Sequence, residues 1–131
     1  MIEFDRSTEI STAQLGSRRP LVVGFGGTIR PDSSSERALR VSLQAAQAAG
    51  AETILIPAAE LDFPMYRPGG KGSASSDRFV EAIRQADGIV IATPGYHGGV
   101  SGLVKNALDY VEDLREDARP YFDGRAVGCI C

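Results

Sequence analysis

The stretch of residues 89–110 constrains the fold more than any other part of the sequence. A short apolar run at 89–92 is followed by a glycine-rich loop and then, from Ser101, by residues with helical spacing. A continuous apolar run of this kind is typical of a strand buried in a parallel sheet. Ligands of open α/β sheets bind outside the carboxyl ends of the strands, so this loop is the first place to expect a binding site.

The same alternation of apolar runs and helical patterns recurs along the chain. It predicts strands at residues 21–25, 53–56, 88–93 and 125–131. Helices are predicted from Glu36, from a cap at Ser75 or Ser76, and from Ser101. We expect Ser34 or Ser35 to cap the first helix and Gly50 to end it. The sequence therefore predicts an α/β, doubly wound parallel sheet with helices on both faces, in three layers.

Length and charge narrow the class of protein. The 131 residues allow one domain, which we place at 20–131 after a polar N-terminal extension at 1–19. A net charge of −3 without a clustered basic face argues against nucleic acid as a partner. No apolar run approaches the roughly 20 residues of a membrane span. The chain start lacks the apolar core of a secretory signal, and we expect a cytoplasmic protein.

The two cysteines, Cys129 and Cys131, lie in the last predicted strand. Side chains two residues apart on a strand point to the same face and are held roughly parallel, which disfavours a disulfide. Two thiols do not make a zinc site, and His97 is the only histidine, so no metal site is predicted. We expect both cysteines to pack in the core.

A polar segment between the first strand and the first helix predicts a phosphate site. Amides at a helix N-terminus lack partners and carry partial positive charge, so they bind anions. Hydroxyl and guanidinium groups that can donate to phosphate surround this position, at Thr28, Arg30, Ser33, Ser34 and Ser35. An ordinary capped helix in a polar loop is the alternative, but a cap needs only one serine. The segment is neither a dinucleotide fingerprint, because Ile29 replaces the third glycine, nor a P-loop.

The loop at residues 93–99, TPGYHGG, predicts a surface for a flat ring. Its glycines, among them Gly95 and Gly98, let the backbone approach a ligand closely. Tyr96 offers an aromatic face and His97 a donor or an acceptor. The alternatives are that Tyr96 anchors the loop on the domain and that His97 is simply exposed to solvent.

Together, these loops resemble the NAD(P)H-dependent FMN reductase family, which has a flavodoxin-like fold. The resemblance rests on GTIRPDSSSERAL at 27–39, on TPGYHGGVSGLVKNALDYV at 93–111 and on LDFPMY at 61–66. It implies that Thr28, Arg30, Ser33 and Ser35 hold the FMN phosphate. It also implies that Pro94, Gly95, Tyr96 and His97 line the isoalloxazine ring, although the family commonly has a side chain at position 95 and Asn at position 97.

The resemblance also implies an activity. It is that of an oxidoreductase, a flavoprotein that uses FMN to pass hydride from NADH or NADPH to a flavin, a quinone, an azo compound or a metal oxyanion. Such a reaction needs no acid–base residue, so none is named as catalytic. The family implies a homodimer or a homotetramer. Lys105, Asn106 and Asp109 match its third helix, where we expect capping, dimer contact or packing.

Two other readings stay open. A flavodoxin-type electron carrier would bind FMN without oxidising NAD(P)H, although the first loop here differs from the usual Thr/Ser-x-Thr-Gly-x-Thr. The family continues beyond the fourth strand, whereas this sequence stops there, so a non-enzymatic, partner-dependent fragment is the other reading. We accordingly expect either a fragment, truncated after strand 4, or a separate element that covers the edge of the sheet.

Overall fold

The apolar runs form one parallel sheet in the computed structural model, which describes residues 18–131. The strands are β1 (Leu21–Gly26), β2 (Glu52–Pro57), β3 (Gly88–Ala92) and β4 (Ala126–Ile130). They lie in the order β2-β1-β3-β4, and every pairing is parallel. The predicted α/β, flavodoxin-like sheet is therefore confirmed.

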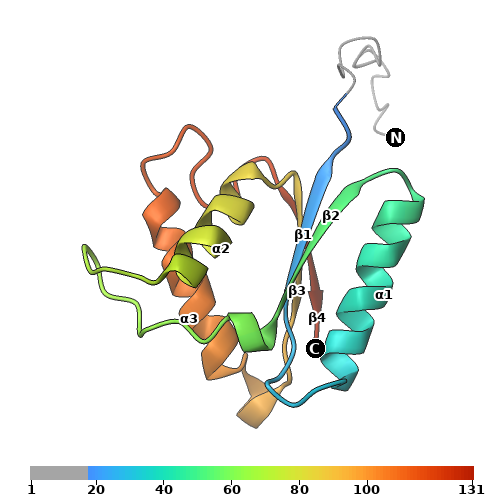
Figure 1. Ribbon diagram of the computed structural model, residues 1–131, viewed down its shortest axis with the longest axis horizontal. Helices are drawn as coiled ribbons and strands as arrows, with labels where there is room; N and C mark the ends of the chain where they lie inside the picture. The colour runs from blue at the N-terminus through green and yellow to red at the C-terminus, as the bar shows by residue number, and fades with distance from the viewer. Residues whose placement is uncertain (1–17) are drawn as a thin grey trace, which may run out of the picture.

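Helices cover both faces of this sheet (Figure 1). Helix α1 (Ser34–Ala48) lies on one face, and α2 (Ala74–Gln85) and α3 (Gly102–Tyr110) lie on the other. Short 3₁₀ turns complete the chain at η2 (Ala58–Glu60), η3 (Tyr96–Gly98) and η4 (Val111–Leu114). The result is the three-layer arrangement that alternating strands and helices predict.

Close packing fixes α1 against β1. Leu39 and Leu43 from α1 are 0% and 5% exposed, and they lie over Gly24 in the middle of the strand. A Cβ atom at Gly24 would lie 2.8 Å from the Cδ1 atoms of both leucines, so a side chain there would require the two leucine side chains to shift. Glycine at this position therefore lets the middle of α1 pack closely on β1.

The opposite face contains the main aromatic core. Phe25 of β1 meets Phe79 of α2 edge-on, with ring centroids 5.0 Å apart. Phe63, in the segment after η2, packs on Phe79 and on Tyr110 of α3. These contacts join α2 and α3 to the sheet and anchor the connection between β2 and α2 through the buried Phe63.

The helix caps differ by one to three residues from the prediction. Helix α1 begins at Ser34, because Ser33 has extended backbone angles and its Oγ accepts from the Glu36 amide at 3.2 Å. Helix α2 is capped by Ser73, which forms a reciprocal capping box with Ser76. In a run of hydroxyl residues, the backbone angle of each residue decides which one caps, and composition does not show it.

The prediction of buried cysteines is wrong. Cys129 and Cys131 are both exposed and unpaired. Strand β4 lies at the edge of the sheet, and Ala126 to Cys129 are exposed along its length. The apolar sequence of β4 therefore did not predict correctly whether its two cysteines are buried.

The chain enters the sheet beside the start of β3. The side chain of Arg18 donates to Asp87 at 2.7 Å, and the Leu21 amide donates to the same carboxylate at 2.8 Å. Of the extension predicted at 1–19, residues 1–17 lie outside the described residues. No helix within 18–131 combines the length and the apolarity needed to span a membrane.

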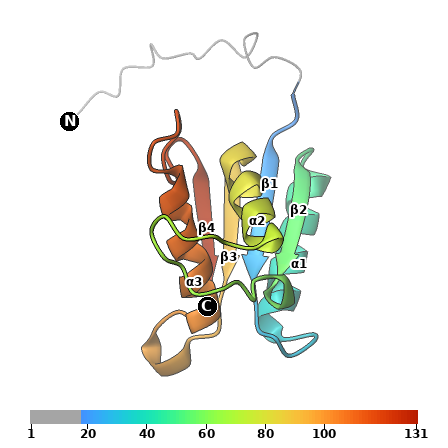
Figure 2. The ribbon, with the colours of Figure 1, turned by 60° about the vertical axis from the view of Figure 1, so that its left-hand side comes forward.

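The loops after β1 and β3 both leave the carboxyl end of the sheet, and the loop after β1 leads into the first turn of α1 (Figure 2). The Gly27 amide donates to the Ala92 carbonyl at 2.9 Å, which joins the two strand ends directly. This end of the sheet is where a ligand site is expected in an open α/β fold.

Candidate functional site

One side of the site is the N-terminus of α1. Because no preceding helical turn exists, the amides of Ser34 and Ser35 have no intrahelical carbonyl to bond. The Ser35 hydroxyl lies 3.4 Å from that of Ser33, and the Thr28 hydroxyl donates to the Arg30 carbonyl at 3.3 Å. Hydroxyl and amide donors therefore gather at the positive end of the helix dipole, which favours an anion.

The charges around α1 are consistent with an anion site. Glu36, in the first turn, is 9% exposed, and its carboxylate accepts from Arg40 at 2.6 Å and 3.1 Å. Its negative charge is thus compensated within the helix. Within residues 18–131, Arg30 forms no ion pair, so its guanidinium is available to a ligand.

The loop between β3 and α3 forms the other side. Thr93 directly follows β3, and its Oγ accepts from the Ser101 amide at 2.9 Å across the base of the loop. The Ser101 hydroxyl in turn caps α3 by accepting from the Val104 amide at 3.3 Å. Between them the loop is exposed, and Tyr96 retains 58% of its surface.

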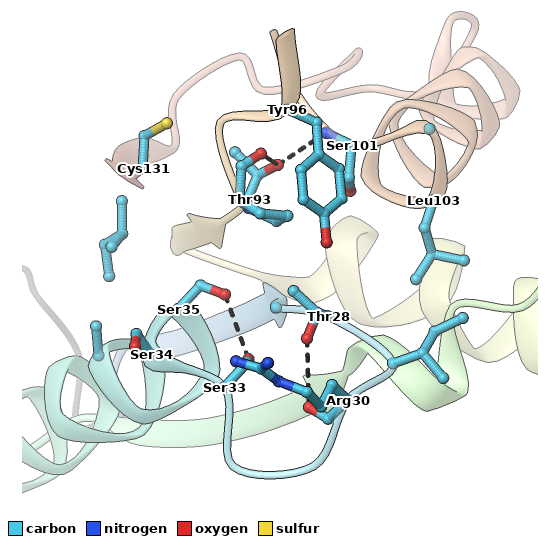
Figure 3. A pocket seen from close by; sticks show the side chains of 16 residues that line it. Thr28, Arg30, Ser33, Ser34, Ser35, Thr93, Tyr96, Ser101, Leu103 and Cys131 are labelled. Carbon is cyan, nitrogen blue, oxygen red and sulfur yellow. Dashed lines mark hydrogen bonds between the residues drawn. The ribbon is translucent and has the colours of Figure 1, made fainter. Parts of the chain in front are cut away.

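A single cavity of about 890 Å³ lies between the two sides (Figure 3). Figure 3 shows the Tyr96 ring extending from the β3–α3 loop across the space toward the loop that follows β1. Leu103, Ile130 and Cys131 add apolar and thiol surface to the lining. The volume falls within the range of about 300–1,000 Å³ that is usual for small-molecule and cofactor sites.

The cavity unites most of the residues that the sequence singles out. Those that line it are Thr28, Arg30, Ser33, Ser34, Ser35, Pro94 and Tyr96. Gly95, His97 and Gly98 belong to the same loop but are not in the lining. His97 has a positive φ of 52° and is exposed, so its backbone rather than its ring shapes the loop.

Several lining residues escape sequence reasoning. Thr93 and Ser101 are 7% and 6% exposed and close the base of the loop. Cys131, expected in the core, instead lines the cavity beside Gly95, where an added Cβ would lie 3.1 Å from its Sγ. Their positions at strand ends and at a helix cap are the only signal that the sequence offers.

The described residues contain no cluster of histidine, cysteine or acidic side chains that could hold a metal ion. The lining does suit a phosphorylated ligand with a flat, partly apolar body. Donors gather at the start of α1, while Tyr96, Leu103 and Ile130 add aromatic and aliphatic contact surface to the lining. FMN has both of these parts, so the residues present fit it.

Solved structures support the fold. FerB, a flavoenzyme NAD(P)H:(acceptor) oxidoreductase from Paracoccus denitrificans, superposes with a TM-score of 0.65 at 22% identity, over 86% of this chain and 60% of that one. An azoreductase from Bacillus anthracis superposes with a TM-score of 0.54 at 13% identity, over 70% of this chain and 54% of that one. At such identities, the likeness concerns the fold alone.

Sequence comparisons place the chain among flavoproteins. It is 30% identical over 102 residues to an iron-sulfur flavoprotein of Methanocaldococcus jannaschii, covering 72% of this chain and 53% of that protein. It is 30% identical over 98 residues to an NAD(P)H-dependent FMN reductase of Pseudomonas aeruginosa, covering 68% and 48% respectively. The chain thus spans about half the length of these relatives.

A family-wide comparison covers nearly the whole described chain. Residues 20–131 match the family described as NADPH-dependent FMN reductase. The match includes both loops that line the cavity and all four strands. The chain therefore belongs to the NADPH-dependent FMN reductase family.

Proposed function

We propose that residues 20–131 form the FMN-binding domain of an NAD(P)H-dependent oxidoreductase. The observation that carries the proposal is the pairing of a hydroxyl-rich helix start with an aromatic loop across one cavity. The family match and the flavoprotein relatives support it. Because the chain spans about half of those relatives, the activity is proposed for the protein to which this domain contributes.

In this proposal, each side of the cavity has a separate task. Thr28, Arg30, Ser33, Ser34 and Ser35 hold the phosphate through hydroxyl, guanidinium and helix-terminal amide donors. Pro94, Gly95, Tyr96, His97 and Gly98 place backbone and side-chain surface along the ring. Tyr96 contributes a face for stacking, and the glycines allow close approach of the backbone.

FMN, when bound, supplies the hydride chemistry that links NADH or NADPH to a flavin, quinone, azo or metal-oxyanion acceptor. The protein orients the cofactor, excludes water from one side and offers backbone donors to its polar edge. Relatives described as a quinone reductase of Escherichia coli and an FMN-dependent NADPH-azoreductase of Staphylococcus haemolyticus support acceptors of these classes. We assign no proton-transfer residue.

We further propose a cytoplasmic protein that forms a homodimer or a homotetramer. Two free, exposed thiols fit a reducing compartment. The exposed edge formed by β4 offers surface for association. Size-exclusion chromatography with light scattering tests the oligomer, and a monomer at micromolar concentration would contradict it.

The decisive experiment is a flavin titration of the purified chain. We expect quenching of FMN fluorescence and retention of flavin absorbance after desalting. Addition of NADPH without oxygen should then bleach the visible bands if the domain supports turnover. Retained flavin without bleaching would favour the electron-carrier alternative, and absence of binding would leave a partner-dependent fragment.

A further inference from the structure

The β3–α3 loop needs an anchor if Tyr96 is to hold a ring. Residues 95–100 are all exposed, and within the loop only two turn hydrogen bonds occur. The Gly98 amide donates to the Gly95 carbonyl at 3.3 Å, and the Gly99 amide donates to the Tyr96 carbonyl at 3.0 Å. His97 has a positive φ, which is unfavourable for a residue other than glycine, and Gly98 has a positive φ that glycine adopts freely, so neither residue makes the loop rigid.

We propose that Thr93 is the positioning residue that holds this loop in its ligand-binding shape. This inference deepens the proposed function, because it concerns the residues assigned there to the ring. It identifies a single buried hydroxyl, which the chemistry of the ligand does not require, as the group that fixes the position of Tyr96.

The hydrogen bonds of Thr93 close the loop at its base. Its Oγ accepts from the Ser101 amide at 2.9 Å and donates to the Pro94 carbonyl at 3.0 Å. Its own amide donates to the Ile130 carbonyl at 3.0 Å, one residue beyond the β3–β4 ladder. One residue therefore connects the end of β3, the end of β4 and the start of α3.

The same contacts separate a positioning role from a ligand-binding role. Thr93 is 7% exposed, and its hydroxyl proton is directed to the Pro94 carbonyl. This buried hydroxyl makes both of its hydrogen bonds within the loop and at its base, which distinguishes it from the half-buried Thr28 on the opposite side, although Thr93 also lies in the cavity wall. Its effect on binding must therefore pass through the loop.

Removing the Thr93 hydroxyl leaves a buried amide without its hydrogen-bond acceptor. In Thr93→Val, whose shape is nearly the same, the Ser101 amide loses its acceptor in a site where both residues are less than 8% exposed. The loop can satisfy that amide only by moving toward solvent. Movement of the loop also changes the spacing between Gly95 and Cys131, where an added Cβ at Gly95 would lie 3.1 Å from the Cys131 Sγ.

Hydrogen exchange tests whether Thr93 holds the loop, and it requires no ligand. In T93V, we expect the hydrogen-bonded amides of the loop, those of Gly98, Gly99 and Ser101, to exchange on the order of tenfold faster, which corresponds to about 1.4 kcal/mol. Thr93→Ser keeps the hydroxyl and should exchange like the wild type. Thr28→Val removes a hydroxyl from the opposite loop and should leave the exchange of these three amides unchanged. Equal exchange in T93V and wild type, or faster exchange throughout the molecule, would overturn the proposal.

A double-mutant cycle tests the effect on FMN. T93V should weaken FMN binding about tenfold in the wild-type background but less than about threefold when Tyr96→Ala is already present. In an Arg30→Gln background, the two effects should add, because Arg30 lies on the phosphate side. Full additivity with Y96A would refute the action of Thr93 through the loop. If T93V fails to fold, T93A replaces it in both experiments.

The two experiments separate this inference from the proposed function. Failure of the wild-type chain to bind FMN would count against the proposed function, while the exchange result would still decide whether Thr93 holds the loop. Normal FMN binding by the wild-type chain, with equal hydrogen exchange in T93V and wild type, would leave the proposed function intact. It would reject the positioning role of Thr93.

Discussion

Gly26 and Ala92 lie so close that a side chain at position 26 has no room. A Cβ atom there would lie 1.9 Å from the Ala92 carbonyl oxygen, and Gly26 has a φ of +117°. The next residue, Gly27, uses that same carbonyl as its hydrogen-bond acceptor. This contact brings together the loops that form the two sides of the cavity.

Gly26→Ala should therefore be strongly destabilising. The new methyl would clash with backbone, and the positive φ is unfavourable for alanine, so we expect a loss of about 3 kcal/mol or more. Urea unfolding followed by circular dichroism measures it. Gly102→Ala is the matched control, because nothing lies within 4 Å of its Cβ position at the start of α3. G102A should equal or exceed the wild type in stability.

Arg30→Gln should weaken FMN binding about tenfold while leaving riboflavin binding unchanged. The guanidinium lines the cavity on the side assigned to the phosphate, and riboflavin lacks that phosphate. Fluorescence titration with both flavins gives the comparison. Arg37→Gln makes the same charge change at an exposed site outside the cavity and should bind FMN normally. An equal loss for both flavins in R30Q would contradict the assignment.

The two cysteines provide a footprint of the bound ligand. Both thiols are exposed, but only Cys131 lines the cavity. We expect FMN to slow alkylation of Cys131 by iodoacetamide at least about fivefold, by direct occlusion and mass action. Cys129 serves as the internal control and should react at the same rate with and without FMN. Peptide mass spectrometry resolves the two sites, and equal protection of both would point to a binding site elsewhere.

Asp87 makes the stability depend on pH. The Leu21 amide, with Arg18 and Arg119 nearby, lowers the pKa of the Asp87 carboxyl below its usual value, against the opposing effect of burial. A lowered folded pKa means that stability is fully present above about pH 4 and is lost as the pH falls through the folded pKa.

Asp87→Asn should thus cost about 1 kcal/mol at pH 7, and the difference from wild type should vanish near pH 2. Urea unfolding at both pH values measures this change. Asp62→Asn removes one exposed carboxylate elsewhere on the surface and is the matched control for the change in net charge. A difference that stays constant with pH would exclude the charge of Asp87 as its source.

Asn106 should matter more for stability than its neighbour Lys105. The Asn106 amide is 8% exposed; it donates to the carbonyls of Phe63 and Pro64 and accepts from the Tyr66 amide at 2.9 Å. Asn106→Leu leaves the Tyr66 amide and the Phe63 carbonyl without partners, while the Pro64 carbonyl keeps the Tyr110 hydroxyl. We expect a loss of about 1–3 kcal/mol by thermal unfolding. Lys105→Gln breaks only an exposed ion pair with Asp109 and should change stability by less than about 0.5 kcal/mol.

The sequence predicted the layers of the fold well because its apolar runs are short and bounded by turns. The strand at 88–93 and the helix after Ser101 were placed within one residue, since the pattern there changes sharply. The cavity followed from the same reasoning, because carboxyl ends of parallel strands share one edge. Thr28, Arg30 and Tyr96 accordingly come together in its lining.

The failures concern features that depend on tertiary contacts. Ser33 caps α1 in preference to Ser34 or Ser35 because of its backbone angles, which composition does not encode. Cys129 is exposed because its strand lies at the edge, and an apolar pattern is the same for edge and central strands. The acceptor role of the Thr93 hydroxyl depends on a partner eight residues away across a loop.

The strand order β2-β1-β3-β4 has an evolutionary consequence. From β1 the chain crosses to β2 over one face, and from β3 it crosses to β4 over the other, so the two connections diverge (Figures 1 and 2). The opening between them is a product of chain direction and needs no particular side chain to create it. Substitutions in the lining can therefore change which molecule is accepted while the opening itself persists, which lets one scaffold diversify its chemistry without refolding.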